Sequence, residues 1–224
     1  MSSVEATDKR DAILKTALAL FTERGFYGTP TAMISREAGV ATGTLFFYFK
    51  TKEDLIDTLY RQIKSQAAAA LRKGVDREPT VQEKIRKVGK NALAWATTHP
   101  DEFRFMEQFA HSPFVSTTAH EEGMSHFLFL EQLVRDGVQE GTLRECDTWL
   151  LCSVLASSLS GLTARIMESP DPGEREILAR QGLSFIWNGI AAHPDGESCE
   201  GTHTNDDKEK EQMTMDQEVS GGNR

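Results

Sequence analysis

Apolar residues recur at helical spacing along most of the chain. In the first segment Ile13, Ala17 and Leu20 lie three or four positions apart, and Gly25 stands where a helix C-terminus favours glycine. The spacing recurs downstream, and the sequence shows neither strand-like alternation nor internal repeats. This pattern predicts an all-α protein of about nine helices. They span about residues 8–24, 31–38, 42–49, 51–73, 81–98, 101–110, 118–140, 147–167 and 174–192.

Breaks and charge divide the chain into three segments. Residues 74–80 contain Gly, Asp and Pro and form the strongest break in the first half. Residues 1–73 carry 11 Lys/Arg against 8 Asp/Glu, residues 74–194 carry 11 against 17, and residues 195–224 carry 3 against 9. The last segment has too few apolar residues to fold by itself. We predict an N-terminal domain with a connecting helix at 8–73, a larger domain at 80–194 and a disordered acidic tail at 195–224.

Two short helices near the N-terminus have the proportions of a helix-turn-helix. Gly39 between them can adopt the left-handed conformation that a sharp turn requires, and Val40 can enter the core. In this motif the second helix enters the DNA major groove. The mildly basic balance of residues 1–73 permits attraction to phosphate, although the whole chain carries −9. Taken by itself, the segment leaves two interpretations open: a DNA-binding domain, or two short helices that merely pack around a glycine turn.

The second of these helices would turn small polar and aromatic groups outward. A threonine hydroxyl can donate to or accept from a base edge, and Phe47 can rest against a thymine methyl group. The helix starts near Thr31 and Thr51, together with the Lys52 ammonium, suit phosphate oxygens. The outward groups are Thr42, Gly43, Thr44, Phe47 and Tyr48.

The same region carries a family resemblance. The run TAMISREAGVATGTLFFYFKTKEDL, from Thr31 to Leu55, resembles the DNA-binding domain of the TetR/AcrR family of bacterial transcriptional regulators. The resemblance covers about residues 8–65. It implies an all-helical homodimer in which three N-terminal helices grip one operator half-site. It also implies a C-terminal domain that binds a small ligand, dimerises through the last two helices and releases DNA when the ligand binds.

By position, the resemblance implies a role for each DNA-facing residue. Thr31 and Lys52 match phosphate contacts. The start of the recognition helix is matched by Thr42, Gly43 and Thr44, and its groove-facing aromatics are matched by Phe47 and Tyr48.

Three positions depart from the usual family pattern. Ala41 stands where serine usually caps the recognition helix, Thr42 where lysine is frequent, and Phe46 where a tyrosine hydroxyl commonly reaches the DNA backbone. We therefore expect fewer phosphate contacts and a shallower salt dependence than in a more basic relative.

The aromatic residues of the larger domain allow two interpretations. They could line an effector pocket, although aromatic residues at helical spacing more often fill a core. The candidates for the pocket are Trp95, Phe109 and Phe127. The six histidines show neither HExxH nor paired Cys/His spacing, so we predict no metal site and no cofactor.

The last two predicted helices offer a candidate dimer interface. The segment 147–167 is apolar on nearly all sides, and the last helix places Gly182 and Gly189 near Phe185. Small residues let helices approach closely, and so apolar a surface needs a cover. A homodimer through these helices would set two recognition helices about one DNA turn, or a multiple of it, apart. The operator should then be nearly palindromic.

Other classes of protein have less support. Ser, Gly, Thr and Arg interrupt residues 149–167, so we expect no membrane span, and the acidic N-terminus is unlike a secretion signal, which favours the cytoplasm. We find no GxSxG, P-loop or GxGxxG motif, so we predict no catalytic residues and no enzyme. A small helical enzyme and a protein-interaction module stay as alternatives. The favoured interpretation is a ligand-responsive transcriptional regulator, a repressor released from a double-stranded DNA operator by a small-molecule effector.

Overall fold

The computed structural model describes residues 3–110 and 112–192, with side chains from Asp8 onward. The acidic tail predicted at 195–224 lies outside the described residues. Within these ranges the chain forms ten α-helices and one 3-10 turn, and its only β-type pairing is an isolated bridge between Leu143 and Ala191. The all-α prediction is confirmed.

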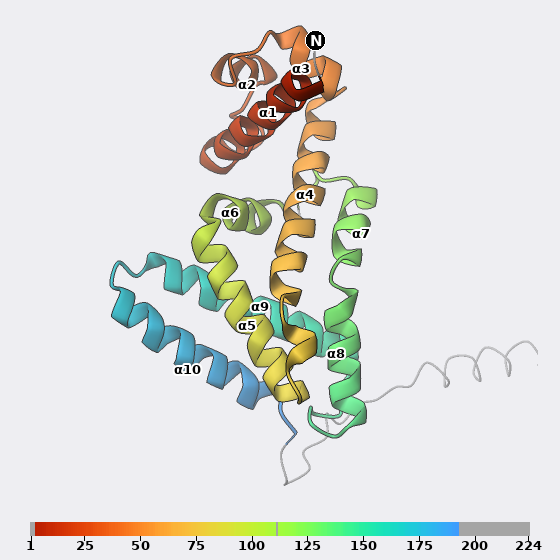
Figure 1. Cartoon of the computed structure of the whole chain (residues 1–224), viewed down its shortest axis with the longest axis vertical. Coiled ribbons are helices and arrows are strands. Elements are labelled where there is room, and N and C mark those ends of the chain that lie inside the picture. Colours follow the sequence, from red (N-terminus) through yellow and green to blue (C-terminus); the bar gives the residue numbers. More distant parts are fainter. Residues whose placement is uncertain (1–2, 111, 193–224) are drawn as a thin grey trace, which may run out of the picture.

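Four helices form the N-terminal part of the molecule. Helices α1–α3 lie at one end of an elongated structure, and α4 runs from that end towards the middle of the other helices (Figure 1). Their bounds are α1 Ser3–Arg24, α2 Thr31–Glu37, α3 Thr42–Tyr48 and α4 Lys52–Arg72.

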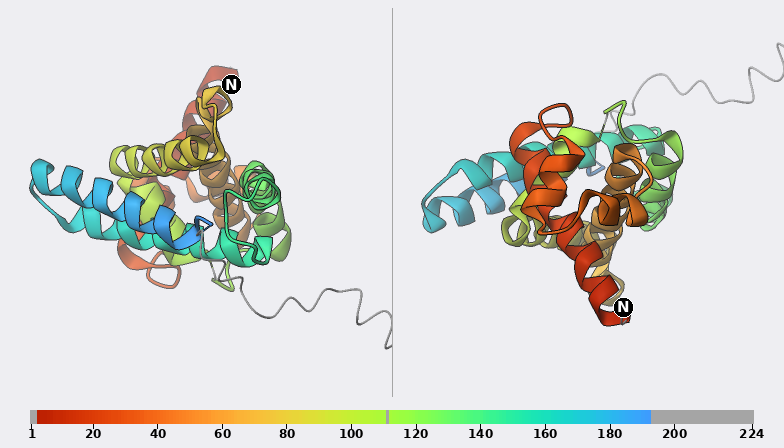
Figure 2. Two further views of the ribbon diagram at one scale, coloured as in Figure 1. Left: turned by 90° about the horizontal axis from the view of Figure 1, so that it is seen from below. Right: turned by 90° about the horizontal axis from the view of Figure 1, so that it is seen from above.

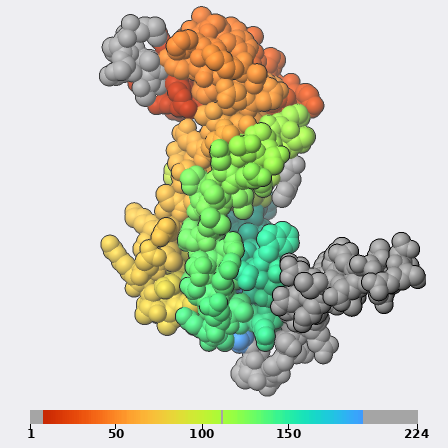
Figure 3. Space-filling model, turned by 90° about the vertical axis from the view of Figure 1, so that its right-hand side faces the viewer, coloured from red at the N-terminus to blue at the C-terminus, as the bar shows by residue number. Residues whose placement is uncertain are grey.

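The remaining helices form the larger C-terminal part. Helices α9 and α10 pack side by side and extend to one side of the molecule (Figure 2). Helix α7 packs along α4, and α8 follows α7 (Figure 3) and packs against α5 and α9. The bounds are η1 Val75–Arg77, α5 Val81–Thr98, α6 Pro100–Phe109, α7 Thr117–Ser125, α8 Leu128–Gln139, α9 Thr148–Glu168 and α10 Pro172–Ile190.

One hydrophobic core joins the two parts. Phe21 of α1, Ile34 of α2 and Leu45 of α3 are fully buried together with the apolar face of α4. The same cluster includes Phe105 and Phe109 of α6. Packing therefore continues past residues 74–80, where the sequence changes its charge and composition.

A second core lies at the far end of the molecule. Val88 of α5, Val134 of α8, Leu155 of α9 and Ile186 of α10 are buried in it. None of the buried residues of α1, α2 or α3 belongs to this second cluster. The two cores thus separate the helix-turn-helix end from the α9–α10 end, and α4 and α5 connect them.

The single helix predicted over 118–140 is wrong, because the chain forms two helices there. Phe127 lies between α7 and α8 with φ −101° and ψ 5°, and its ring packs against the first core. Leu133 and Val134 enter the second core instead. Because of this break, residues 118–140 can pack against both hydrophobic cores. The described chain therefore has ten α-helices where nine were predicted. No Gly or Pro residue stands at the break, so the sequence gives no local signal from which the break could be predicted.

Helix α9 bears on the expectation that the chain has no membrane span. By length and composition alone it could cross a membrane, because the Ser, Thr and Gly residues that interrupt it carry little hydropathic penalty. In this fold Leu151, Leu155 and Leu159 of α9 are buried in the second core. Arg165 pairs with Glu174 at the other end, with 3.1 Å between Nη2 and Oε1. Helix α9 is thus packed on one face and uncovered on the other.

Candidate nucleic-acid interface

Helix α3 is anchored on one face only. Leu45 is fully buried and Phe49, directly after the helix, is 2% exposed. The turn before it is held by Gly39 at φ 67° and by the bond from the Val40 amide to the Ser35 carbonyl, 2.9 Å. The left-handed turn expected at Gly39 is confirmed. The opposite face of α3 is left to solvent.

The five recognition-helix candidates differ in exposure. Thr42 and Gly43 are exposed, and Thr44 is half-buried. Phe47 is 71% exposed, so its ring stands away from the core. Tyr48 is half-buried against the first core and meets Phe47 edge-on, with ring centroids 5.2 Å apart. The structure therefore brings these residues together at one helix, but turns Tyr48 partly inward.

The hydroxyl of Tyr48 is buried and makes no hydrogen bond within the described part of the chain. A buried hydroxyl without a partner carries a desolvation cost. The sequence pattern predicted an outward aromatic here, and the ring instead shares the packing of Phe49, with ring centroids 6.5 Å apart. Phe47 is consequently the more accessible aromatic group of α3.

Gly43 has no internal reason to be glycine. Its φ is not positive, and a Cβ built on it would meet no described atom within 4 Å. Glycine in a helix costs roughly 0.5–1 kcal/mol relative to alanine. The absence of a packing reason within the described residues is consistent with a backbone that is approached from outside.

Thr31 and Lys52, the two phosphate candidates, lie differently. Thr31 is half-buried at the start of α2, where Pro30 is the N-cap and no side chain caps the helix within the described chain. Lys52 lies at the start of α4, and its ammonium donates to the Phe26 carbonyl. Burial lowers the pKa of Lys52, against an opposing effect of the nearby Glu53 carboxylate. Lys52 is therefore held by the α1–α2 loop.

Lys50 is a cation that the sequence interpretation missed. It is exposed in the turn between α3 and α4. Its amide donates to Asp54 Oδ2 at 2.8 Å, while the Asp54 amide donates to Thr51 Oγ1 at 3.0 Å. This cap fixes the turn beside α3. A lysine directly after the last apolar residue of a recognition helix is the signal that could have identified it.

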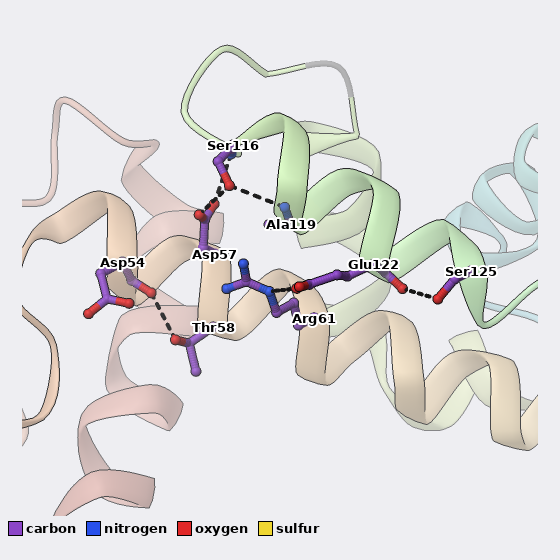
Figure 4. A network of polar contacts seen from close by, with 8 residues as sticks. All are labelled: Asp54, Asp57, Thr58, Arg61, Ser116, Ala119, Glu122 and Ser125. Atoms are coloured by element: carbon purple, nitrogen blue, oxygen red, sulfur yellow. Dashed lines mark hydrogen bonds and ion pairs between the residues drawn. The ribbon is translucent and has the colours of Figure 1, made fainter.

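A polar network ties α7 to α4 (Figure 4). Asp57 of α4 accepts hydrogen bonds from the amide and hydroxyl of Ser116, at 2.9 and 2.5 Å. The Ser116 hydroxyl oxygen accepts from the Ala119 amide at 3.2 Å and so caps α7. One turn further along α4, Arg61 pairs with Glu122. The start of α7 is thereby fixed to the N-terminal half of α4.

An apolar and aromatic layer lies beneath this network. The buried Tyr60 hydroxyl lies 3.1 Å from His120 Nδ1, and burial raises the pKa of Tyr60 to about 12. Gly123 lets α7 approach, since a Cβ there would lie 2.7 Å from Tyr60 Cε1. Lys64 lies over the rings of Tyr60 and Phe127, at 5.4 and 5.3 Å from their centroids. Burial lowers the pKa of Lys64, although the Glu107 carboxylate acts in the opposite direction.

The three effector candidates lie in or against the first core. Trp95 is 6% exposed and stacks on His99, and Phe109 is 2% exposed and stacks on Phe105. Phe127 is half-buried beneath Lys64. A small crevice between α5, α9 and α10 is lined by other residues, among them Ile85, Gly89, Leu159, Leu183 and Trp187. The role of Trp95, Phe109 and Phe127 as effector contacts stays a prediction.

The outer faces of α9 and α10 expose large apolar groups. Trp149 is 75% exposed and Phe185 is 81% exposed. A Cβ at Gly182 would lie 2.3 Å from Leu162 Cδ1, so that glycine serves the packing of α10 on α9. Among the residues that the structure describes, Cβ atoms at Gly161 and Gly189 would meet nothing within 4 Å. The space beside these two glycines is open to another helix.

Comparisons with known proteins agree with this geometry. Residues 13–59 match the model of the family described as bacterial regulatory proteins, tetR family. The crystal structure of a chain assigned to the tetR family of transcription regulators, from Shewanella sp. PV-4, is 31% identical and has a TM-score of 0.77. The match covers 83% of this chain and 99% of that one.

Two further relatives extend the comparison. The uncharacterized HTH-type transcriptional regulator YhgD of Bacillus subtilis is 24% identical over 83% of this chain and 98% of its own length. The crystal structure of FadR from Bacillus subtilis in complex with stearoyl-CoA has a TM-score of 0.68 at 20% identity, and covers 80% of this chain and 98% of that one. The latter likeness concerns the fold.

The fold and its half-exposed α3 define a helix-turn-helix transcriptional regulator. The chain belongs to the TetR family.

Proposed function

We propose that this chain acts in the cytoplasm as a homodimeric repressor that places α3 of each copy in a DNA major groove. The observation that carries the proposal is the two-sided character of α3. Leu45 and Phe49 hold the helix in the first core, while Thr42, Gly43 and Phe47 stand in solvent. A short helix that is firmly seated yet bare on one face suits insertion into a groove.

The proposal divides the contacts by chemistry. Thr42 and Thr44 would meet base edges through their hydroxyls, and Phe47 would rest against a thymine methyl group. The bare backbone at Gly43 would allow close approach of the helix. Tyr48 would contribute ring contacts at the edge of the groove.

Phosphate contacts would come from the flanks of α3. Thr31 begins α2, Lys52 begins α4, and the exposed Lys50 lies between α3 and α4. Each phosphate neutralised by a cation adds about 0.9 to the slope of log affinity against log salt concentration. With so few cations, the slope should be shallow for a protein of this class.

A twofold partner would cover the outer faces of α9 and α10. The exposed Trp149 and Phe185 and the open space beside Gly161 and Gly189 support a four-helix interface between two copies. The dimer would set the two α3 helices about 34 Å apart, or a multiple of that distance, to match a nearly palindromic operator.

The effector would be a small molecule with a large apolar part and an anionic end. The aromatic groups Trp95, Phe109 and Phe127 supply an apolar environment near α4. The ammonium of Lys64, on a half-buried side chain that lies over two rings, would gain from an anionic partner. Two proteins share the fold: FadR of Bacillus subtilis, whose crystal structure is a complex with stearoyl-CoA, and KstR2 of Mycobacterium tuberculosis, a ketosteroid transcriptional regulator.

Repression would be relieved through coupled equilibria. An effector that prefers a dimer whose α3 helices are misplaced for the operator weakens operator binding. By reciprocity, bound operator weakens effector affinity by the same factor. A coupling of 1–3 kcal/mol, about 5–150-fold, is typical for such a switch.

A DNA-selection experiment tests the proposal. Purified protein would be used to select duplexes from genomic DNA, and the enriched sites would be titrated in a gel-shift assay. Thr42→Ala should weaken binding, whereas Thr118→Ala, which removes an exposed threonine from the first turn of α7, should not. Enrichment of nearly palindromic sites is the expected result. No retarded complex with any enriched duplex, or equal binding by the Thr42→Ala variant, would contradict the proposal.

A further inference from the structure

The ring of Phe26 in the α1–α2 loop is held between two groups from distant parts of the chain. Phe114 stacks on it almost in parallel, with ring centroids 3.9 Å apart and planes 6° apart. The ammonium of Lys52 lies 3.9 Å from the same centroid and also donates to the Phe26 carbonyl. Because a parallel ring occupies one face, Lys52 must lie over the other. Phe26 is therefore sandwiched.

The sandwich is supported at its rim. Tyr27 meets Phe26 and Phe114 edge-on, with ring centroids 5.6 and 5.1 Å away. Phe26 also stacks towards the buried Phe21 of α1, at 6.3 Å. These contacts leave the Phe26 ring little freedom to move independently of its neighbours.

Phe114 belongs to the C-terminal part of the molecule. It lies between α6 and α7, and its amide donates to Ser112 Oγ at 3.2 Å. Two residues later Ser116 is bonded to Asp57 of α4 and caps α7 (Figure 4). A movement of α6 or α7 would therefore displace Phe114 and change its stacking contact with Phe26.

Lys52 receives its position from this sandwich. The Lys52 side chain is only half-buried, so general packing does not fix its ammonium group. The closest described partners of the ammonium are the carbonyl and the ring of Phe26. A cation held against a ring face and a carbonyl keeps one geometry, whereas a free lysine samples many. The location of the charge thus depends on Phe26, and the location of Phe26 depends on Phe114.

We infer that Phe114 is a positioning residue for DNA binding, which sets the Lys52 ammonium through the Phe26 ring and gives the C-terminal helices a route to the operator. The inference rests on the proposed phosphate contact of Lys52. Phe114 itself touches no DNA. Its effect is to place a charge that another residue carries.

The salt dependence of operator affinity tests this role. Affinity of a selected operator duplex would be measured by fluorescence anisotropy at several salt concentrations for wild type, Lys52→Met, Phe114→Ala and the double variant. A dimer that loses both Lys52 contacts should lose about 1.8 from the slope, at about 0.9 for each contact. Phe114→Ala removes no charge, yet it should lower the slope by at least half of the Lys52→Met decrease.

Companion variants separate positioning from folding. The double variant should show no further decrease in slope beyond Lys52→Met, because both changes remove one contact. Phe114→Tyr keeps the stacking ring and should restore the wild-type slope. Leu128→Ala, at the exposed start of α8, is the control that should leave the slope unchanged. If Phe114→Ala does not fold, Phe114→Leu keeps apolar bulk without a flat ring and should show the decrease.

Each other outcome has a definite meaning. A wild-type slope in Phe114→Ala and Phe114→Leu, beside a lower slope in Lys52→Met, would overturn the positioning role. An unchanged slope in Lys52→Met would remove the phosphate contact and the inference with it, while DNA binding itself would stand. Failure of the wild-type protein to bind any selected duplex would instead count against the proposed function.

Discussion

The outer face of α3 and the outer faces of α9 and α10 are both uncovered, but they offer different chemistry. On α3 the exposed groups are small and polar, apart from the rings of Phe46 and Phe47. On α9 and α10 they include Trp149 and Phe185, with glycines beside open space. A long apolar face gains most from another apolar face, whereas a short face of hydroxyls and rings suits base edges. Exposure alone therefore does not define the partner.

The largest expected effect comes from placing a charge on the α10 face. Phe185→Glu would bury an unpaired carboxylate in the proposed dimer interface, at a cost of about 3 kcal/mol or more per copy. We expect a monomer in analytical ultracentrifugation and a loss of operator affinity of more than about 100-fold. Phe185→Leu, which keeps an apolar group, should remain dimeric. A dimeric Phe185→Glu protein would show that this face is not the interface.

A smaller effect is expected from truncation on the α3 face. Phe47→Ala should reduce operator affinity by about 1–3 kcal/mol, because the ring would no longer contact the groove. The free energy of unfolding should change by less than about 0.5 kcal/mol, since the ring is 71% exposed. Gel-shift titration and urea denaturation measure the two quantities. A large loss of stability with unchanged affinity would reverse the assignment of this ring.

The smallest expected effect is that of Gly43→Ala, which should stabilise the fold and at the same time weaken DNA binding. Gly43→Ala should raise the free energy of unfolding by about 0.5–1 kcal/mol, since the new Cβ meets no described atom within 4 Å. The same methyl group should weaken operator binding if DNA approaches the backbone there. Gly161→Ala on α9 is the matched control.

The control distinguishes the two faces. Its Cβ also meets no described atom of the same chain within 4 Å, so Gly161→Ala should strengthen α9 and alter dimerisation rather than the operator contact. At protein concentrations that keep the dimer intact, its operator affinity should equal that of wild type. Equal affinities for Gly43→Ala and wild type would argue against close approach at α3.

Local signals predicted much of the fold. Helical spacing predicted a helix over residues 42–49, where α3 lies, and the turn at Gly39 followed from the freedom of glycine at positive φ. These features depend on residues close together in sequence, so a single chain can reveal them.

Other features depend on contacts that sequence spacing does not encode. The break at Phe127 exists because α7 and α8 serve different cores. The position of Lys52 depends on Phe26, 26 residues earlier, and that of Phe26 on Phe114, far downstream. The half-burial of Tyr48 likewise follows from tertiary packing rather than helical period. The candidate residues of α3 could be named from the sequence, but the tertiary contacts that position them and their neighbours could not.

Chemical interference mapping tests the central claim most directly. Dimethyl sulfate methylates guanine N7 in the major groove and adenine N3 in the minor groove, and each modification can be scored for its effect on binding of a selected operator. The account predicts that methylated guanines interfere in two symmetric clusters, centred about one DNA turn or a multiple of it apart. Interference confined to adenine N3, or a single unpaired cluster, would contradict it.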